Sequence, residues 1–592
     1  MADPRDISDA GAPHPIRRAV LKTLATLGIA APVFGRALSA LAEEGGTPAV
    51  TPEMIRRAEW VSGLSLTDEQ RELMRNGVNG LTESFARLRG VSLDNGVAPA
   101  IVLDPLVPDP SASAEDAGRR EAATPRAPAG ADPPGSPDDL AFASVVDLAG
   151  WVRSGKLAPN DLAELSLARL ERYGPALECV IERTPGRAAE DVRHAGELRD
   201  AGDGGSGLVG VPWGAKDLLS VPGTRTTWGA KPYENQRRDE HAAVAERLRA
   251  AGAVLTAKLT VGALAWGDVW YGGTTRNPWN PEQGSSGSSA GPAAATAAGL
   301  VPFAIGTETW GSIVSPSTRC GVTGLRPTFG RVSRRGCMAL SWTMDKIGPM
   351  ARSAEDCAWI FAAIAGADPG DRTTRDVPFS VPGVERARSV RVGVVRDLFD
   401  HDWTADIEDE AERARGREWR AHDARTLEEL EGTGLRLDEV RLPGGLPVDD
   451  LAFVLTAEAA TAFDDLTRSG RDAELVRQVE HAWPNVFRQG QLIPAVEYLR
   501  ANRIRRLLME EMERFFESVD VFVAPTFGGS HLLLTNLTGH PSITMPNGFR
   551  ASDGTPTSIT FTGRLDGEED LLAVAMAWQD ATDHHRRRPP LP

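Results

Sequence analysis

Three short segments concentrate the residues that could do chemistry. The first, GVPWGAKDLL over 210–219, places one lysine, Lys216, among apolar residues and glycines. The other two, GSSGSSAG over 284–291 and GTETWGSIVSPS over 306–317, are rich in serine and glycine. Burial disfavours the charged form of a lysine, and glycines let backbone amides turn toward a common point. The first segment therefore indicates a buried amine, and the glycines of the other two suit a site that stabilises an oxyanion.

The serine-rich segment 284–291 is not typical of a flexible linker. It is followed directly by an apolar, helix-like stretch over 292–312 that leads to the second serine-bearing loop. Linkers do not usually lie inside a core, so we do not expect this segment to be a linker.

These segments resemble the amidase signature family. That family has a lysine in G-x-P-x-x-x-K-D, then a G-G-S-S-G-G-S run, then a G-T-D-x-G-G-S-I loop, with its two key serines 24 positions apart. Here Ser288 and Ser312 are also 24 positions apart, and Lys216 precedes Ser288 by 72 positions. The resemblance extends from about Leu140 to about Leu572, and further matching text lies at 274–281, 299–307, 324–336, 345–352 and 535–548.

The resemblance implies a role for each matched residue. Ser312 would attack the carbonyl carbon, Ser288 would bridge, and Lys216 would take the proton as a neutral amine. The reference pKa of a lysine is about 10.4, so the site must lower it by roughly three units. A cis peptide bond next to Ser288 is also implied. The residues expected to form the oxyanion and substrate-binding site are Thr309, Trp310, Gly311, Ser286 and Gly287, with the amide of Ser312 as a further donor.

The chain departs from the family pattern close to the nucleophile. The departures are Ser286-Gly287 for Gly-Gly, Ser289-Ala290 for Ser-Gly, Glu308 for Asp, Trp310 for Gly and Val314 for Arg. Two uses of Trp310 stay open: its indole packs beneath the loop as core, or it walls the acyl pocket. Either way, the three catalytic positions are intact.

The function expected from this resemblance is hydrolysis of a carbon-nitrogen amide bond in a small-molecule substrate, with no cofactor and no metal. Two alternatives stand beside it. One is the A subunit of a tRNA-dependent amidotransferase, which uses the same three residues to supply ammonia to a partner. The other is an amidase-fold protein that has lost activity, an idea motivated by the bulk of Trp310.

Weaker motifs have simpler explanations. Residues 205–210 fit G-x-G-x-x-G, but these glycines precede a strand-like run and do not link a strand to a helix. Residues 287–291 fit the G-x-S-x-G elbow of Ser-His-Asp hydrolases, but no strand-like stretch comes before them. The ten histidines are scattered without an H-E-x-x-H pair, so a metal site is not expected.

Charge and cysteine content narrow the partners. The chain has 65 Lys and Arg against 82 Asp and Glu, a net charge of −17. A net acidic body repels phosphate backbones and anionic lipid heads, so nucleic acid is not an expected partner. The four cysteines, Cys179, Cys320, Cys337 and Cys357, form no CxxC pair and are expected to be small buried or half-buried side chains.

Helical segments alternate with short apolar runs after residue 139, which favours an α/β layered core. The resemblance implies a three-layer α/β/α fold with a large mixed central sheet over 139–592. Before it, residues 52–92 carry helix signals, including Thr67 as an N-cap, and residues 43–104 are predicted to form a small helical N-terminal arm. Residues 105–138 are rich in Pro and Ala and are predicted to be a flexible linker.

The first 42 residues look like an export signal. Arg17-Arg18 and Lys22 precede an uncharged stretch over 23–34 that is too short to span a bilayer, and Ala40-Leu41-Ala42 fits a signal-peptidase site. This order resembles a twin-arginine signal. We therefore expect an exported protein, periplasmic or extracellular, without stable membrane insertion after signal removal, and a homodimer remains open.

Overall fold

The computed structural model describes residues 49–102, 132–201 and 207–591. The predicted export signal, 1–42, lies outside the described residues, as does the segment 105–131 of the predicted linker. The last two residues of that linker, Pro137 and Asp138, form the first turn of helix α5 (Pro137–Ala141), which Ser136 caps.

A mixed sheet of eleven strands forms the centre of the described molecule, in the order β1-β3-β2-β8-β10-β9-β14-β15-β13-β11-β12. Its strands are β1 (Val180–Arg183), β2 (Pro212–Lys216), β3 (Val254–Leu259), β8 (Phe303–Glu308), β9 (Thr323–Arg326), β10 (Lys346–Ala351), β11 (Arg391–Val394), β12 (Arg436–Glu439), β13 (Val521–Pro525), β14 (Ser542–Phe549) and β15 (Pro556–Gly563). β2 runs parallel to β3 and β8, whereas β10 is antiparallel to β8 and β9. Two short hairpins join β4 (Val269–Trp270) to β5 (Gly273–Thr274) and β6 (Arg276–Asn277) to β7 (Asn280–Gly284).

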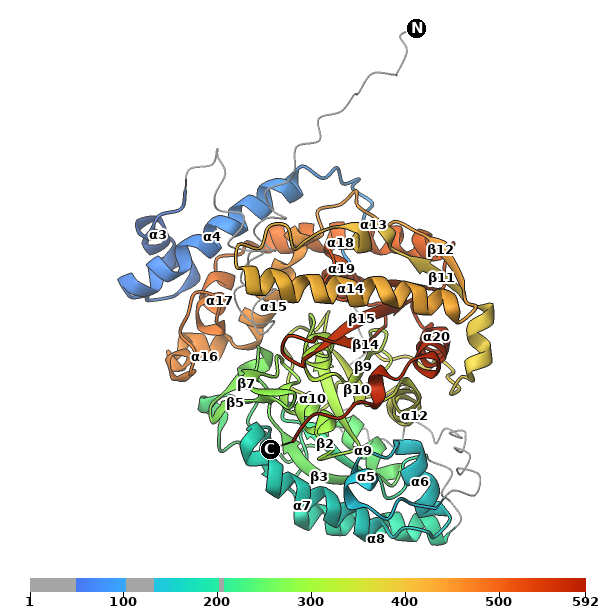
Figure 1. Ribbon diagram of the computed structural model, residues 1–592. Helices are drawn as coiled ribbons and strands as arrows, with labels where there is room; N and C mark the ends of the chain where they lie inside the picture. The colour runs from blue at the N-terminus through green and yellow to red at the C-terminus, as the bar shows by residue number, and fades with distance from the viewer. Residues whose placement is uncertain (1–48, 103–131, 202–206, 592) are drawn as a thin grey trace.

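Helices cover both faces of the sheet. They are α3 (Pro52–Ser62), α4 (Asp68–Arg89), α5, α6 (Val145–Arg153), α7 (Pro159–Leu177), α8 (Pro185–Asp200), α9 (Ala243–Ala250), α10 (Ala290–Ala297), α11 (Val314–Cys320), α12 (Ala354–Ile364), α13 (Arg396–Asp400), α14 (Glu410–Gly432), α15 (Phe453–Ala462), α16 (Asp464–Arg468), α17 (Trp483–Gly490), α18 (Ala495–Phe516), α19 (His531–Thr538) and α20 (Glu568–Ala581). Figure 1 shows α7 and α8 at the lower end of the molecule and α14 and α18 at the upper end.

Alternation along the strands places neighbouring side chains in different hydrophobic clusters, three of which pack against the sheet. In β8, Ile305 packs with the core beneath α6, α9, α12 and α20, and its neighbour Ala304 packs on the opposite side against α7 and α10. In β13, Val523 joins the first core, while Phe522 joins a third cluster made with α15, α17, α18 and α19. Because successive strand residues face opposite sides, each central strand is buried on both faces. The predicted three-layer α/β/α fold is confirmed.

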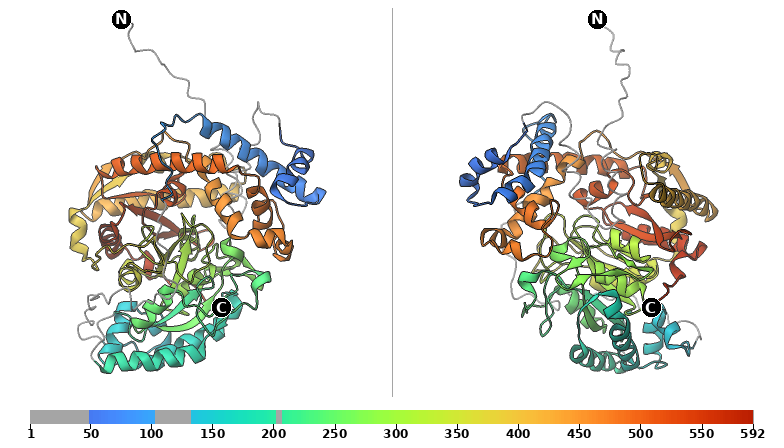
Figure 2. Two further views of the ribbon diagram at one scale, coloured as in Figure 1. Left: turned by 180° about the vertical axis from the view of Figure 1, so that it is seen from behind. Right: turned by 60° about the vertical axis from the view of Figure 1, so that its left-hand side comes forward.

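The helix signals in 52–92 are confirmed as α3 and α4. Thr67 caps α4 with a full capping box to Gln70. The buried stripe of α4 packs against α17 and α18, and a Cβ on Gly77 would lie only 2.3 Å from the side chain of Gln489. An ion pair of 2.7 Å joins Arg87 to Asp450, a residue far along the chain. The views in Figure 2 agree that this arm lies at the periphery beside α17.

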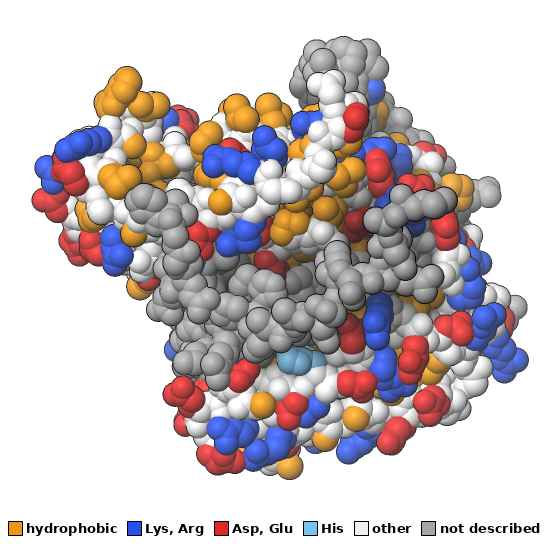
Figure 3. Space-filling model, turned by 90° about the horizontal axis from the view of Figure 1, so that it is seen from above, with side chains coloured by type: hydrophobic (Ala, Val, Ile, Leu, Met, Phe, Trp, Pro, Cys, Tyr) orange, Lys and Arg blue, Asp and Glu red, His pale blue; other side chains and the backbone are white. Residues whose placement is uncertain are grey.

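Exposed hydrophobic side chains gather on the arm. Trp60 and Val61 of α3 are 83% and 72% exposed, and Met54 is 48% exposed. Figure 3 shows this edge of the molecule on the left, where hydrophobic side chains lie beside Lys, Arg, Asp and Glu. Among the described residues, no helix combines the length and apolar character needed to cross a membrane.

Two expectations about elements were wrong in part. The stretch 292–312 is helical only to Ala297 and then continues as strand β8. A central strand buried on both faces is a continuous apolar run, which periodicity does not separate from a buried helix. The segment 535–548 contains a core strand, β14, and β15 follows it in the same sheet. A short strand, β7, also precedes 287–291, but it belongs to a two-stranded hairpin outside the main sheet.

Candidate active site

Lys216 is the last residue of β2 and is completely buried. Its Nζ lies 2.8 Å from Ser288 Oγ, 3.0 Å from Ser289 Oγ, 2.7 Å from Thr307 Oγ1 and 3.2 Å from the Thr307 carbonyl oxygen. Burial lowers the pKa of Lys216 to about 7, although nearby Cys337, Asp345 and Glu308 act in the opposite direction. An amine with this pKa is neutral in a large fraction of molecules near pH 7, as a general base requires.

The oxygens around the amine suit both of its protonation states. Ser289 Oγ donates to the carbonyl of Thr307, so it can only accept from Lys216. The hydroxyls of Ser288 and Thr307 can rotate and act as donor or acceptor. Lys216 therefore keeps hydrogen-bond partners whether or not it has taken a proton.

The segment 284–291 is folded tightly against its surroundings. The peptide bond between Gly287 and Ser288 is cis, as the family resemblance implies. A Cβ on Gly287 would lie 1.8 Å from the carbonyl oxygen of Gly267, so only glycine fits there. Ser286 has a φ of +60°, and its N–H donates to the Asp268 carboxylate over 2.9 Å. The run is thus a rigid part of the core and not a linker.

Two contacts join this segment to the loop that carries Ser312. The N–H of Ser289 donates to the Ser312 carbonyl oxygen over 3.1 Å. The hydroxyls of Ser286 and Ser315 are 2.8 Å apart. Ser312 itself is half-buried in the turn between β8 and α11. The structure therefore brings both serine segments and the end of β2 to one place.

Glu308, the last residue of β8, organises the turn that follows. Its completely buried carboxylate accepts from the N–H groups of Ile313 and Val314 over 2.8 and 3.0 Å. The same carboxylate forms a 2.7 Å ion pair with buried Arg326 and accepts from Asn536 over 2.9 Å. Burial alone would raise its pKa, but the Arg326 charge and these hydrogen bonds lower the pKa of Glu308 to about 2. Glu308 is therefore charged at neutral pH.

This arrangement limits which amides can bind an oxyanion. The N–H groups of Ile313 and Val314 are taken by Glu308, so they cannot serve. The predicted donors lie earlier in the loop, at 309–312, where Gly311 has a φ of +81°. The hydroxyl of Thr309 is not directed to a substrate but donates to Asp345 over 2.5 Å.

Trp310 packs against the core cluster formed with α15, α17, α18 and α19. Its side chain is half-buried. A cavity lined in part by Thr307 and Thr309 lies nearby, and Trp310 is not among the residues that line that cavity. These contacts favour packing over a pocket wall as the main role of the indole.

Several residues of the site were not foreseen from the sequence. Ser289 and Thr307 contact the Lys216 amine, although both stood out only as members of the matched motifs. The role of Arg326 as partner of Glu308 had no sequence signal, because the two lie on different strands. The cysteine prediction is confirmed: Cys179, Cys320 and Cys357 are buried, and Cys337 is half-buried. Within the described residues no group of three or more His, Cys, Asp or Glu side chains is arranged to hold a metal ion.

Comparison with known proteins places this site in a family. A family model described as Amidase matches residues 161–533, and the chain therefore belongs to the amidase family. The chain is 35% identical over 484 residues to the A subunit of glutamyl-tRNA(Gln) amidotransferase from Roseiflexus castenholzii, covering 74% of this chain and 95% of that one. A protein of the same name from Methylococcus capsulatus is 34% identical over 496 residues, covering 75% of this chain and 98% of that one.

Solved structures give the same fold. The X-ray structure of a native peptide amidase from Stenotrophomonas maltophilia aligns with a TM-score of 0.66 at 28% identity, covering 76% of this chain and 98% of that chain. The chain is thus similar both to an amidase and to amidotransferase subunits, and membership of the family allows cleavage of an amide C–N bond in either setting.

Proposed function

We propose that this protein cleaves a carbon-nitrogen amide bond through an acyl-enzyme on Ser312, with Ser288 as the proton bridge and Lys216 as the general base. The observation that carries the proposal is the buried Lys216 amine, with its pKa lowered to about 7, lying 2.8 Å from Ser288 Oγ. At this distance the Ser288 hydroxyl can pass a proton to the amine and take it back, as a proton bridge beside a general base requires.

The proposed reaction runs in two halves. In the first, Ser312 Oγ bonds to the carbonyl carbon while its proton passes through Ser288 Oγ to the neutral Lys216 amine. The oxyanion is stabilised by loop amides within 309–312. The tetrahedral intermediate then breaks its C–N bond, and the departing nitrogen receives the proton held by Lys216. In the second half, water attacks the acyl-enzyme by the same proton route and releases the acid.

A second candidate is the A subunit of a tRNA-dependent amidotransferase, which would release ammonia from an amide donor for a partner. The specific observation in its favour is the 35% identity over 484 residues to a protein of that kind. Features of the sequence that favour a free-standing amidase are the net charge of −17 and the export-like pattern around Arg17-Arg18. For the same reasons we propose that the protein is exported by a twin-arginine-type route and acts on a small-molecule amide without nucleic acid.

The test is Ser312→Ala, measured with a panel of small amides that includes glutamine. We expect loss of all hydrolysis at an unchanged melting temperature, because only one oxygen atom is removed. A fluorophosphonate should label the unmodified protein and not the variant. Ser518→Ala, at an exposed serine, is the matched control and should retain full activity.

Two outcomes would count against parts of the proposal. Hydrolysis that survives in Ser312→Ala would refute the assignment of the nucleophile. Turnover of glutamine alone, and only after addition of a partner complex, would favour the amidotransferase role over the free-standing amidase.

A further inference from the structure

A cavity of about 190 Å³ lies beside the catalytic lysine. Thr307, whose hydroxyl contacts Lys216, and Thr309, three residues before Ser312, form part of its wall. The loop that joins β9 to β10 supplies most of the rest, and the segment around Asp371 closes one side. The cavity therefore adjoins the proposed reaction centre without being part of it.

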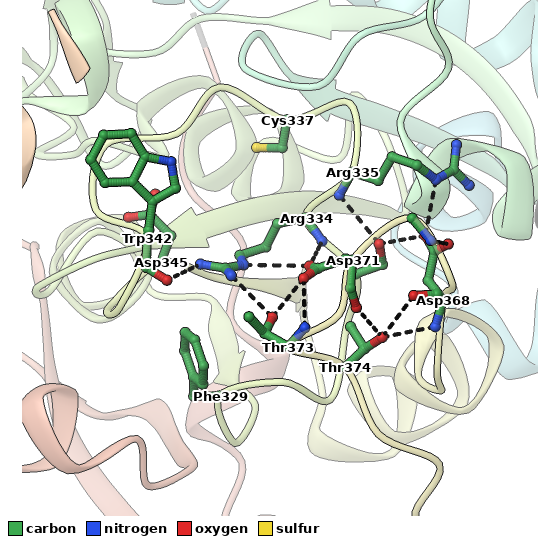
Figure 4. A network of polar contacts seen from close by, with 12 residues as sticks. Phe329, Arg334, Arg335, Cys337, Trp342, Asp345, Asp368, Asp371, Thr373 and Thr374 are labelled. Atoms are coloured by element: carbon green, nitrogen blue, oxygen red, sulfur yellow. Dashed lines mark hydrogen bonds and ion pairs between the residues drawn. The ribbon is translucent and has the colours of Figure 1, made fainter. Parts of the chain in front are cut away.

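The charged side chains of this wall are already engaged with other protein groups. Figure 4 shows Arg334 donating to the Trp342 carbonyl oxygen and to Thr373 Oγ1, at 2.6 and 3.0 Å. Its guanidinium also lies over the Phe329 ring, 4.9 Å from the centroid, and 3.5 Å from the carboxylate of Asp371. The charge of Arg334 is thus balanced by a carboxylate.

The remaining charged groups of the wall also have partners within the protein. Arg335 pairs with Asp368 at 3.0 Å and with Glu246 at 2.8 Å. Asp345 accepts from Thr309 Oγ1 and from two backbone N–H groups of the β9–β10 loop. Lys346 donates to the Met344 carbonyl oxygen. A charged substrate group in the cavity would have to compete for groups that already have partners.

The side chains without charge that line the cavity are mostly apolar. They include Leu218, Cys337, Met338, Leu340, Trp342 and Ile347. An apolar cavity of roughly 150 Å³ holds one benzene molecule, so about 190 Å³ suits one ring or a short branched chain.

We propose that this cavity is the subsite for an uncharged, apolar substrate group about the size of a phenyl ring, attached to the amide that Ser312 attacks. This inference rests on the proposed function and deepens it by naming the substrate class. Glutamine would bring an ammonium and a carboxylate, and each would lose water and have to displace an existing hydrogen-bond or ion-pair partner in this wall. The cavity therefore selects against the amide donor of an amidotransferase and in favour of neutral aryl or alkyl amides.

Cys337 provides a test that does not depend on turnover. It is half-buried in the cavity wall, while the other three cysteines are buried, so alkylation should report on this site alone. Burial raises the pKa of its thiol to about 12, so labelling should be slow and easily followed by mass spectrometry. Cys337→Ser is the control for selective labelling.

The experiment measures the rate of Cys337 alkylation by N-ethylmaleimide in Ser312→Ala protein, with benzamide, 4-carboxybenzamide or glutamine present. Benzamide should slow labelling about tenfold at saturation, and the two charged amides at the same concentration should not. Equal protection by 4-carboxybenzamide or glutamine, or no protection by benzamide, would overturn the inference. Neither result affects the proposed chemistry at Ser312, which is judged by turnover in the unmodified protein.

A second variant narrows the cavity. Ala339 lines it, so Ala339→Leu should lower kcat/KM for benzamide by about tenfold relative to acetamide. Ala421→Leu, the same change at an exposed position of α14, should leave the ratio unchanged. An unchanged ratio in Ala339→Leu would contradict the assignment of the cavity. If the variant folds with a lower melting temperature and loses activity on both amides, the labelling experiment decides the assignment instead.

Discussion

Three hydroxyls and one carbonyl oxygen surround the Lys216 amine in a space without water-exposed surface. The family resemblance predicted Lys216 and Ser288 as partners, and the direct contact of 2.8 Å agrees with that expectation. Ser289 and Thr307 could not be predicted, because their contact with the amine depends on how β8 lies beside β2 and on the turn after Gly287. A sequence motif reports neither.

The lowered pKa of Lys216 predicts the pH dependence of the rate. Below about pH 7 the amine is protonated and cannot accept the Ser312 proton, so kcat should rise with pH through about 7 and then level off. Lys216→Ala should lose orders of magnitude in kcat, while Lys231→Ala, at an exposed lysine, should behave as the unmodified protein. A kcat that does not change between pH 5 and 9 would contradict the role of Lys216. Hydrolysis that is lost on adding a chelator and restored by zinc would instead point to a metal enzyme.

Trp310→Gly separates packing from pocket shape. The indole packs against the core cluster of α15, α17, α18 and α19, so its removal should reduce the free energy of unfolding by about 3 kcal/mol and lower activity on all amides alike. Trp342 lines the cavity and is 47% exposed, so Trp342→Gly should change stability little and alter the substrate profile instead. If Trp310→Gly left both the melting temperature and the substrate profile unchanged, the indole would serve neither as core packing nor as a wall of the acyl pocket.

At the scale of elements, the turn between β8 and α11 is held by one carboxylate. Glu308 ends the strand, accepts the first two amides after Ser312 and is anchored by Arg326 on β9, two strands away from β8 in the sheet. The sequence indicated the loop and its glycines but placed the preceding residues in a helix. The strand was missed because a run buried on both faces carries no alternation, so only its pairing with β2 and β10 identifies it.

Glu308→Gln should therefore affect both stability and rate. It leaves the Arg326 charge buried without its counter-charge, which should reduce the free energy of unfolding at pH 7 by about 3 kcal/mol or more. We expect kcat to fall more than KM rises, because the loop amides lose their orientation. Glu431→Gln, at an exposed glutamate of α14, is the control.

The sign of the pH dependence gives an independent check on Glu308. The pKa of Glu308 is lowered from 4.5 to about 2. The contribution of its charged carboxylate to the free energy of unfolding is therefore fully present above about pH 4.5 and is lost as pH falls through about 2. The stability difference between the unmodified protein and Glu308→Gln should therefore shrink below pH 4.5. A difference that grew on acidification would contradict the charged state assigned here.

At the scale of the whole molecule, alternation of helices and apolar runs was enough to predict the layers. The strand order was not predictable. In the sheet, β13 lies between β15 and β11, whereas in the chain it precedes β15 and begins well over a hundred residues after β11. Such non-local pairing leaves no local pattern in the sequence. The N-terminal arm was predicted as helical, but nothing in its own residues indicated that it would pack on α17 and α18.

Export is the prediction that concerns the chain as a whole. Residues 1–45 fused to a reporter should direct it out of the cytoplasm, because Arg17-Arg18, the uncharged stretch and Ala40-Leu41-Ala42 occur in the order of a twin-arginine signal. Changing Arg17 and Arg18 together to Lys should abolish this. Cell fractionation is the measurement, and equal export of the double variant would refute the twin-arginine route.

The packing of α4 constrains the order in which the molecule can fold. Ser84 and Arg87 bond to Asp450, and Arg89 bonds to Glu497, so the partners of α4 lie more than 360 residues later in the chain. During synthesis the apolar stripe of α4 is made first and stays uncovered until α15, α17 and α18 have emerged. Closing so long a loop is slow, and an uncovered stripe is a site for aggregation in the meantime. Among the residues that the structure describes, the arm is therefore the first helical unit to be synthesised and among the last to reach its native contacts.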